Sequence, residues 1–147
     1  MRFVDCNTMY LPFLCKKLGY CPSAWAQCIT CVDETGKPLA GVIYDAYNGV
    51  SVNAHIWMEG RPHKEWFVAI FDYPFNKLGV TKVVGQVGGN NKKAQLLDQH
   101  FGFVEEGRVR DYSEDGDLLM YTMTRDQCRV LNSPLWNQTV RLVEAVA

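Results

Sequence analysis

The stretch Val80–Phe103, VTKVVGQVGGNNKKAQLLDQHFGF, contains the pattern that decides the fold. Its first part, Val80–Val87, is rich in β-branched residues and predicts a short buried strand. Gly88-Gly89 then predicts a turn, and Asn91 is a favourable N-cap for a helix that runs to Phe101. Gly102 predicts the end of that helix, because glycine adopts a left-handed conformation without steric cost. The stretch therefore predicts strand, turn, helix and stop in close succession.

The helix predicted over Asn91–Phe101 is amphipathic. Its inner stripe consists of Ala94, Leu97 and Phe101. We expect four polar side chains to face outward, namely Lys92, Lys93, Gln95 and Gln99. Asp98 is expected to be either a surface or an inter-helix hydrogen-bond acceptor rather than a catalyst.

The segment before this stretch predicts a second strand and a long helix. Val50–Met58 alternates, with Val52, Ala54 and Ile56 on one face and Asn53, His55 and Trp57 on the other. Residues 65–78 are apolar on almost every side, which predicts a buried helix that Pro74 kinks or ends and Gly79 terminates. A strand, a helix and a strand in this order form a crossover, so strands 50–58 and 80–87 are expected to be parallel.

The remaining segments predict antiparallel strands around this crossover. Residues 1–5 form an edge strand, and Met9–Leu18 a helix capped by Thr8. Antiparallel strands follow at Ala26–Val32 and Leu39–Tyr47, before an Asn48-Gly49 turn, and again at Phe103–Tyr112 and Leu118–Met123. We expect one α/β domain over residues 1–147, with a mixed, mostly antiparallel sheet, one parallel strand pair and flanking helices. The tail, 124–147, is expected to hold a short helix and a last segment near Leu135–Val146.

Composition excludes several classes of protein. The chain has 147 residues, 48% of them hydrophobic and 21% charged, which is typical of one soluble globular domain. The net charge of -1 gives no basic excess that would favour nucleic acid or an anionic membrane. No apolar run is long enough to span a bilayer, and Asp5 and Asn7 interrupt any signal-peptide pattern. We therefore expect a cytoplasmic protein without nucleic-acid or membrane partners.

The six cysteines include one Cys-x-x-Cys pair, Cys28 and Cys31, which suggests a zinc or redox site. The pair lies in a predicted strand, where residues three apart point to opposite faces. No second such pair is present in the sequence. Buried free thiols are therefore the favoured interpretation, and no metal site is expected.

An ordered set of residues resembles the GNAT N-acetyltransferase superfamily, most closely its ribosomal-protein and amino-acid N-acetyltransferase (Rim-like) type. Asn91-x-x-Ala94 is followed by Gly102-Phe103, and then by Glu106-Gly107 and Arg110, at spacings similar to that subgroup's signature. The segment FDYPFNKLGVTKVVGQV, residues 71–87, resembles its aromatic helix and valine-rich strand. The resemblance covers about residues 50–130.

The resemblance implies an acetyl-CoA-dependent enzyme that transfers an acetyl group directly to a primary amine of a protein or small molecule. In such a fold the two parallel strands splay apart, and the pantetheine arm pairs with the backbone near Ile56, Trp57 and Met58. The pyrophosphate would meet the loop and helix start that contain Gly60, Arg61, His63 and Lys64. Asn91 would hydrogen-bond the pantetheine amides, and Ala94 is a further candidate for cofactor binding. Lys92, Lys93 or Arg61 would lie near the ribose phosphate. Glu59 and His55 are the candidate bases for the incoming ammonium group.

Two departures from the family pattern leave alternatives open. The phosphate loop, EGRPHK at 59–64, has one glycine, and Asp98 occupies the position where many relatives carry a tyrosine that protonates the leaving thiolate. An ionised aspartate has no proton to give. A catalytically degenerate GNAT-fold interaction protein is therefore the alternative function, and a zinc or redox protein is a third. The C-terminal segment with Leu135 and Trp136 packs either within the chain or in a homodimer.

Overall fold

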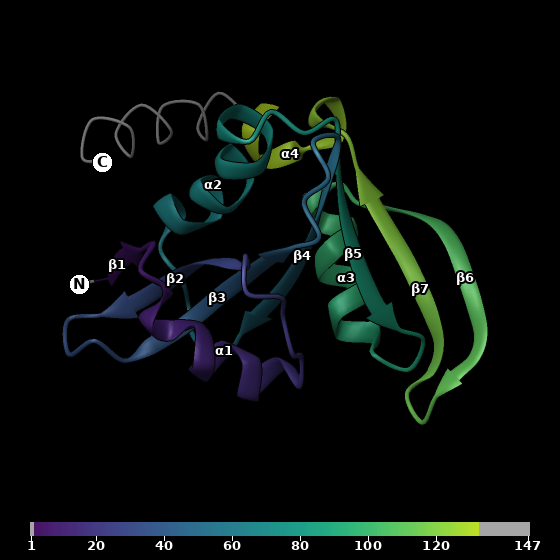
Figure 1. Cartoon of the computed structure of the whole chain (residues 1–147), viewed down its shortest axis with the longest axis horizontal. Coiled ribbons are helices and arrows are strands. Elements are labelled where there is room, and N and C mark those ends of the chain that lie inside the picture. The colour runs from purple at the N-terminus through teal and green to yellow at the C-terminus, as the bar shows by residue number, and fades with distance from the viewer. Residues whose placement is uncertain (1, 133–147) are drawn as a thin grey trace.

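A seven-stranded mixed sheet forms the centre of the computed structural model, which describes residues 2–132 (Figure 1). The strands, in chain order, are β1 (Arg2–Asp5), β2 (Gln27–Asp33), β3 (Pro38–Asp45), β4 (Ser51–Met58), β5 (Lys82–Gly88), β6 (Val104–Ser113) and β7 (Gly116–Met123). The helices are α1 (Leu11–Leu18), α2 (Lys64–Asp72), α3 (Lys92–Phe101) and α4 (Arg129–Asn132), with short turns η1 (Thr8–Tyr10), η2 (Tyr73–Lys77) and η3 (Arg125–Gln127). The segment predicted near Leu135–Val146 lies outside the described residues.

The strand order is β1-β2-β3-β4-β5-β7-β6. Every neighbouring pair is antiparallel except β4 and β5, which are parallel. The predicted crossover through α2 is therefore confirmed, as is the mixed α/β sheet. Among the described residues, no helix has both the length and the apolar character that a membrane span requires.

Helices cover both faces of the sheet. On one face, Leu14 of α1 packs with Ile43 and Trp57. On the other face, α2 and α3 enclose the main core, where the indole Nε1 of Trp66 donates a 3.1 Å hydrogen bond to the Ile29 carbonyl. The alternation predicted for Val50–Met58 is confirmed, because Val52 and Ala54 belong to the main core and Trp57 to the α1 side.

The first helix begins differently from the prediction. The cap is Asn7 rather than Thr8, because the Asn7 side chain accepts a 3.0 Å hydrogen bond from the Met9 amide. One 3₁₀ turn, η1, precedes α1, and Pro12 lies in the first turn of α1, where its missing N–H is not needed.

Proline ends the regular part of the long helix, as predicted. Pro74 lies in η2, a π-helical turn in which the Leu78 amide bonds the Tyr73 carbonyl at 2.8 Å. Gly79 then takes a φ of 71°, which lets the chain turn into β5.

Gly102 ends α3 for two physical reasons. Its φ is 115°, and its N–H donates to the carbonyls of Asp98 and Gln99. A Cβ at this position would lie 1.9 Å from the carbonyl oxygen of Gln127, which is in η3. Only glycine therefore fits between the end of α3 and the chain that follows β7.

Candidate active site

The parallel strands β4 and β5 separate after three residue pairs. The three pairs are Ser51 with Lys82, Val52 with Val83, and Asn53 with Val84. Beyond them, residues 54–58 of β4 do not pair with residues 85–88 of β5. Figure 1 shows the two strands together at one end and diverging toward the other, with α3 visible between them. Their facing backbone groups are available to another extended chain, which is how a strand-like ligand is held in a sheet.

A cleft of about 310 Å³ occupies this gap. It is lined by Leu18, Gly19, Tyr20, Ala54, His55, Ile56, Gly85, Gln86, Val87, Gly88, Asn91, Ala94, Leu97, Asp98, Phe103 and Leu118. Only three of these described residues titrate, namely Tyr20, His55 and Asp98. The wall of the cleft thus combines polar and apolar groups, and it carries one candidate base and one carboxyl group.

Asn91 caps α3 at the mouth of this cleft. Its side-chain oxygen accepts a 3.1 Å hydrogen bond from the Ala94 amide, so the capping prediction is confirmed. Because the oxygen is used in the cap, the amino group of the side chain is the part that can donate to a ligand. Ala94, one turn into the helix, forms part of the same wall.

Two polar residues of α3, Gln95 and Asp98, are buried, although Gln95 was expected to face outward. Gln95 is 9% exposed and donates to the carbonyls of Gly88 and Gly89 at 3.1 and 3.0 Å, which fixes the turn before α3. Asp98 is 8% exposed and lines the cleft. Burial alone raises the pKa of Asp98 to about 7. Of the two positions expected for Asp98, the surface position is therefore wrong, because the side chain is buried.

His55 reaches the cleft from β4, under the loop that follows α1. Its ring stacks on Tyr20 with centroids 3.9 Å apart. Burial lowers the pKa of His55, and the charge of Asp45 opposes this only in part. Its Nε2 atom is buried and has no hydrogen-bond partner in the described part of the chain. A neutral imidazole with a free nitrogen is suited to accept a proton.

Asp45 anchors Tyr20 in this position. Tyr20 donates a 2.8 Å hydrogen bond from its hydroxyl to Asp45, which also accepts from the Ser23 amide at 2.8 Å. Burial would raise the pKa of Asp45, but hydrogen bonds from Ser23, Ala46 and Tyr20 lower it to about 2. Burial, with the bond to Asp45, raises the pKa of Tyr20 to about 12, so this hydroxyl stays protonated.

Glu59, the other candidate base, does not line the cleft. It follows β4 and forms an ion pair with Lys17 of α1 at 3.4 Å, with 62% of its side chain exposed. His55 and Glu59 are therefore not brought together, and a catalytic role for Glu59 stays a prediction.

The candidate backbone contacts lie along the open edge of β4. Ile56 lines the cleft, and Met58 packs on the main core. The side chain of Trp57 turns to the opposite face, where it meets Phe13 edge-on at 5.3 Å. Any contact of Trp57 with a ligand in the cleft would therefore come from its backbone.

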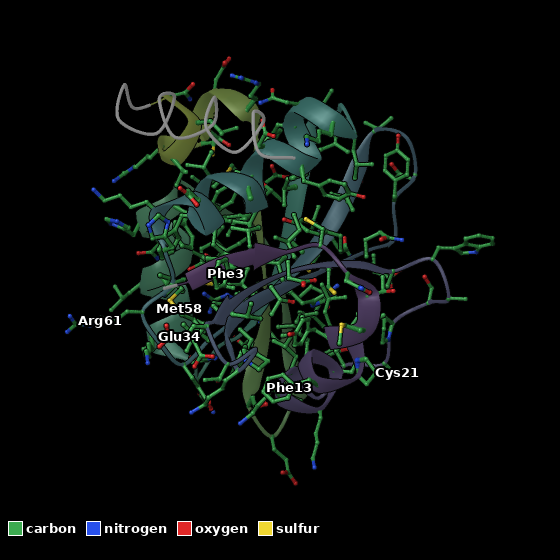
Figure 2. All side chains as sticks on the ribbon, turned by 90° about the vertical axis from the view of Figure 1, so that its left-hand side faces the viewer. Phe3, Phe13, Cys21, Glu34, Met58 and Arg61 are labelled. Carbon is green, nitrogen blue, oxygen red and sulfur yellow. The ribbon has the colours of Figure 1, made fainter. Side chains whose placement is uncertain are left out.

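The predicted phosphate loop has few amide groups to offer. The amides of Glu59 and Gly60 both bond the Leu39 carbonyl, at 3.1 and 2.9 Å. His63 caps α2 by accepting from the Glu65 amide at 3.3 Å. The positive side chains remain accessible: Lys64 is exposed, and Arg61 projects away from the body of the protein near Met58 (Figure 2).

The cysteines form no metal site within residues 2–132. Cys28 belongs to the core under α1 and Cys31 to the core under α2, so the two thiols lie on opposite faces as predicted. No group of three or more His, Cys, Asp or Glu side chains in the described residues is arranged to hold a metal ion.

Two signals in the sequence indicate that Asp98 and Gly85 belong to the cleft. Asp98 lies at the i+4 position of the stripe that begins at Ala94, between Leu97 and Phe101, and this spacing indicates burial. Gly85 interrupts a β-branched strand, which often marks a close approach of a ligand. Tyr20 follows the glycine that ends α1, and no sequence pattern indicates its role.

Solved structures of one bacterial enzyme share this architecture. Mutant forms of the spermidine/spermine N-acetyltransferase SpeG from Vibrio cholerae align with a TM-score of 0.68 and 16% identity, over 86% of this chain and 96% of that chain. The same enzyme in complex with CoA and spermine aligns with a TM-score of 0.67 and 16% identity, over 86% and 96%. No protein-family model and no curated protein sequence matches this chain. At such identities the likeness concerns the fold, and the chain has the GNAT fold.

Proposed function

We propose that this chain is an acetyl-CoA-dependent N-acetyltransferase that transfers an acetyl group directly to a primary amine. The observation that carries the proposal is the separation of β4 and β5 beyond Asn53 and Val84, which leaves a cleft of mixed polar and apolar lining between them. If the protein did not bind a strand-like ligand, two adjacent parallel strands would be expected to stay paired, because unpaired backbone groups are costly to bury. None of the residues 60–64 lines or fills the cleft.

The groups along the gap between β4 and β5 suit the successive parts of acetyl-CoA, from the pantetheine arm to the phosphates. The pantetheine arm has amides that pair with strand edges, and the amino group of Asn91 is placed to donate to one of them. At the wide end, Arg61, His63 and Lys64 offer positive charge, and α2 offers the positive end of its dipole to the pyrophosphate. Lys92 and Lys93, exposed at the start of α3, are candidates for the ribose phosphate.

The acceptor amine would approach from the α1 side, where His55 and Tyr20 line the cleft. His55 is the favoured base, because its buried Nε2 is free and its neutral form predominates. Backbone N–H groups of the open edge of β4 would polarise the thioester carbonyl. Glu59 remains a second candidate base, acting through water.

The class of acceptor amine is proposed only by analogy with a solved structure. The Vibrio cholerae enzyme has been solved with CoA and spermine, so a polyamine joins amino acids and protein N-termini as a candidate acceptor. We also propose that the acceptor specificity is that of the Rim-like type, which acetylates ribosomal proteins or amino acids, and that the chain forms homo-oligomers. That enzyme has a dodecameric structure, and light scattering of this chain tests self-association.

A catalytically degenerate interaction protein is the second candidate. The specific observation in its favour is the loop at 59–64, where the Leu39 carbonyl already occupies the amides of Glu59 and Gly60. This alternative predicts no binding of acetyl-CoA.

Ligand-induced stabilisation separates the two candidates. A ligand at 100 times its Kd adds about 2.7 kcal/mol, which raises Tm by roughly 5–10 °C for a chain of this size. The cleft variant is Gly85→Val, because a Cβ there would stand 3.9 Å from both the Ala54 carbonyl and the Asp98 carboxyl, where a ligand would lie.

Gly107→Val is the matched control, since Gly107 is also a strand glycine with only ordinary contacts, the nearest being Met120 at 3.8 Å. We expect acetyl-CoA to raise the Tm of the wild type and of Gly107→Val, and to leave Gly85→Val unchanged. A wild-type Tm that does not respond to millimolar acetyl-CoA would refute the proposal.

A further inference from the structure

The carboxyl group of Asp98 lies at the narrow end of the cleft. Ala54 and Gly85 are the first residues beyond the last β4–β5 pair. A Cβ built on Gly85 would lie 3.9 Å from Asp98 Oδ2 and 3.9 Å from the Ala54 carbonyl oxygen. The carboxyl thus stands over the point where the two strands separate.

This point is where the reactive end of a strand-like ligand would come to rest. The ligand enters from the wide end, where the loop at 59–64 and the start of α3 supply the groups that suit phosphates. Its opposite end is therefore directed to the apex of the gap, beside Ala54, Gly85 and Asp98. For an acyl thioester, that end contains the carbonyl carbon and the sulfur.

The surroundings of Asp98 favour a protonated carboxyl. Ala94, Leu97 and Phe103 form the wall around it, and burial alone raises its pKa to about 7. No described cation forms an ion pair with it. The titratable groups of the elements around the cleft are His55 on β4, Lys82 on β5, Asp117 and Tyr121 on β7, the exposed Lys92, Lys93 and His100 on α3, Cys15, Lys16 and Lys17 on α1, and Tyr20 after it.

Asp98 is also the one described group lining the cleft that can release a proton near neutral pH. Tyr20 holds its proton to a pKa of about 12 and donates it to Asp45. His55 is neutral and accepts rather than donates. The cleft therefore contains one base and one acid, which reach it from β4 and from α3.

We propose that Asp98 is the general acid that protonates the departing thiolate, an inference that rests on the proposed acetyltransferase function. His55 takes one proton from the substrate ammonium, and the free amine attacks the thioester carbonyl carbon. The C–N bond forms, the C–S bond breaks, and its electron pair goes to sulfur. Asp98 gives its proton to that sulfur, so CoA leaves as a thiol. The nitrogen of the new amide returns a proton to the Asp98 carboxylate, and His55 releases its proton to solvent.

The test uses Asp98→Asn, which keeps the shape of the side chain but has no acidic proton. Asp72→Asn is the control, since Asp72 is also buried, at 2% exposure, but lies in α2 outside the cleft, where it accepts a hydrogen bond from Asn76. Asp98→Glu restores the acid and serves as the conservative rescue. Release of CoA thiol is measured against pH for each protein, with an amine panel of spermine, lysine and a peptide with a free N-terminus.

We expect Asp98→Asn to keep the Tm shift with acetyl-CoA, to lose about 100-fold or more in kcat, and to lose the falling limb of the pH profile above neutrality. Asp98→Glu should recover part of kcat, and Asp72→Asn should match the wild type. An active wild type with Asp98→Asn within about threefold of its kcat, and with the falling limb retained, would overturn the role of Asp98 alone. A wild type without any acetyl-CoA shift or thiol release overturns the acetyltransferase function as well.

Discussion

The substitution Gly102→Ala tests why α3 ends where it does. Alanine at a φ of 115° carries a backbone cost of about 1–2 kcal/mol. In addition, the new Cβ would lie 1.9 Å from the Gln127 carbonyl oxygen, well inside the 3.4 Å of ordinary contact. Since that atom belongs to a backbone, η3 must move away from α3, and overpacking of this kind costs about 1–3 kcal/mol. The expected loss in free energy of unfolding is therefore about 2–5 kcal/mol.

Gly19→Ala is the matched control for this substitution. Gly19 ends α1 with a φ of 63°, inside the left-handed region that alanine adopts at a modest cost, and no atom lies within 4 Å of its Cβ. Urea denaturation of both variants, followed by circular dichroism, gives the two free energies of unfolding. We expect Gly102→Ala to be the less stable by about 1–3 kcal/mol, or roughly 2–12 °C in Tm. Equal losses in the two variants would show that the contact with Gln127 has no energetic weight.

Two further predictions concern buried polar groups. Because burial raises the pKa of Asp98 to about 7, the folded protein holds an extra proton above the unfolded pKa of about 3.9. Relative to Asp98→Asn, the wild type should therefore lose on the order of 4 kcal/mol in free energy of unfolding between about pH 4 and pH 7. If the difference in free energy of unfolding between the two proteins is constant over this range, burial does not raise the pKa of Asp98. Trp66→Phe removes the donor to the Ile29 carbonyl and should cost about 1–3 kcal/mol in urea denaturation. Trp25→Phe, at a side chain 89% exposed, should change stability by less than about 0.5 kcal/mol, and equal effects would refute the argument.

The order of the elements was predictable because it depends on close neighbours in the chain. Asn91 caps α3, Pro74 interrupts the regular helix, and Gly102 stops α3, each through backbone geometry within a few residues. The start of α1 was mispredicted by one residue, because Asn7 and Thr8 are both good caps and the choice depends on a 3₁₀ turn.

The candidate site was predictable in part. Asn91, Ala94, His55 and Ile56 line one cleft, and the binding and catalytic roles that the resemblance implies for them stay predictions. The candidates in the loop after β4 do not line the cleft. The amide of Gly60 is already bonded to the carbonyl of Leu39, which lies on the neighbouring strand. Such pairings depend on sheet register, which no local pattern specifies.

The sequence by itself determined the parallel crossover and the strand-turn-helix-stop of Val80–Phe103, since these follow from periodicity and from the conformational limits of glycine, proline and asparagine. Only the tertiary structure decided that β4 and β5 part after three pairs and that Asp98 is enclosed between them. The reason is that the charge state of a carboxyl depends on how much water reaches it. For Asp98 that access is set by Gly85, Phe103 and the wall of α3, which come together only when the sheet has formed.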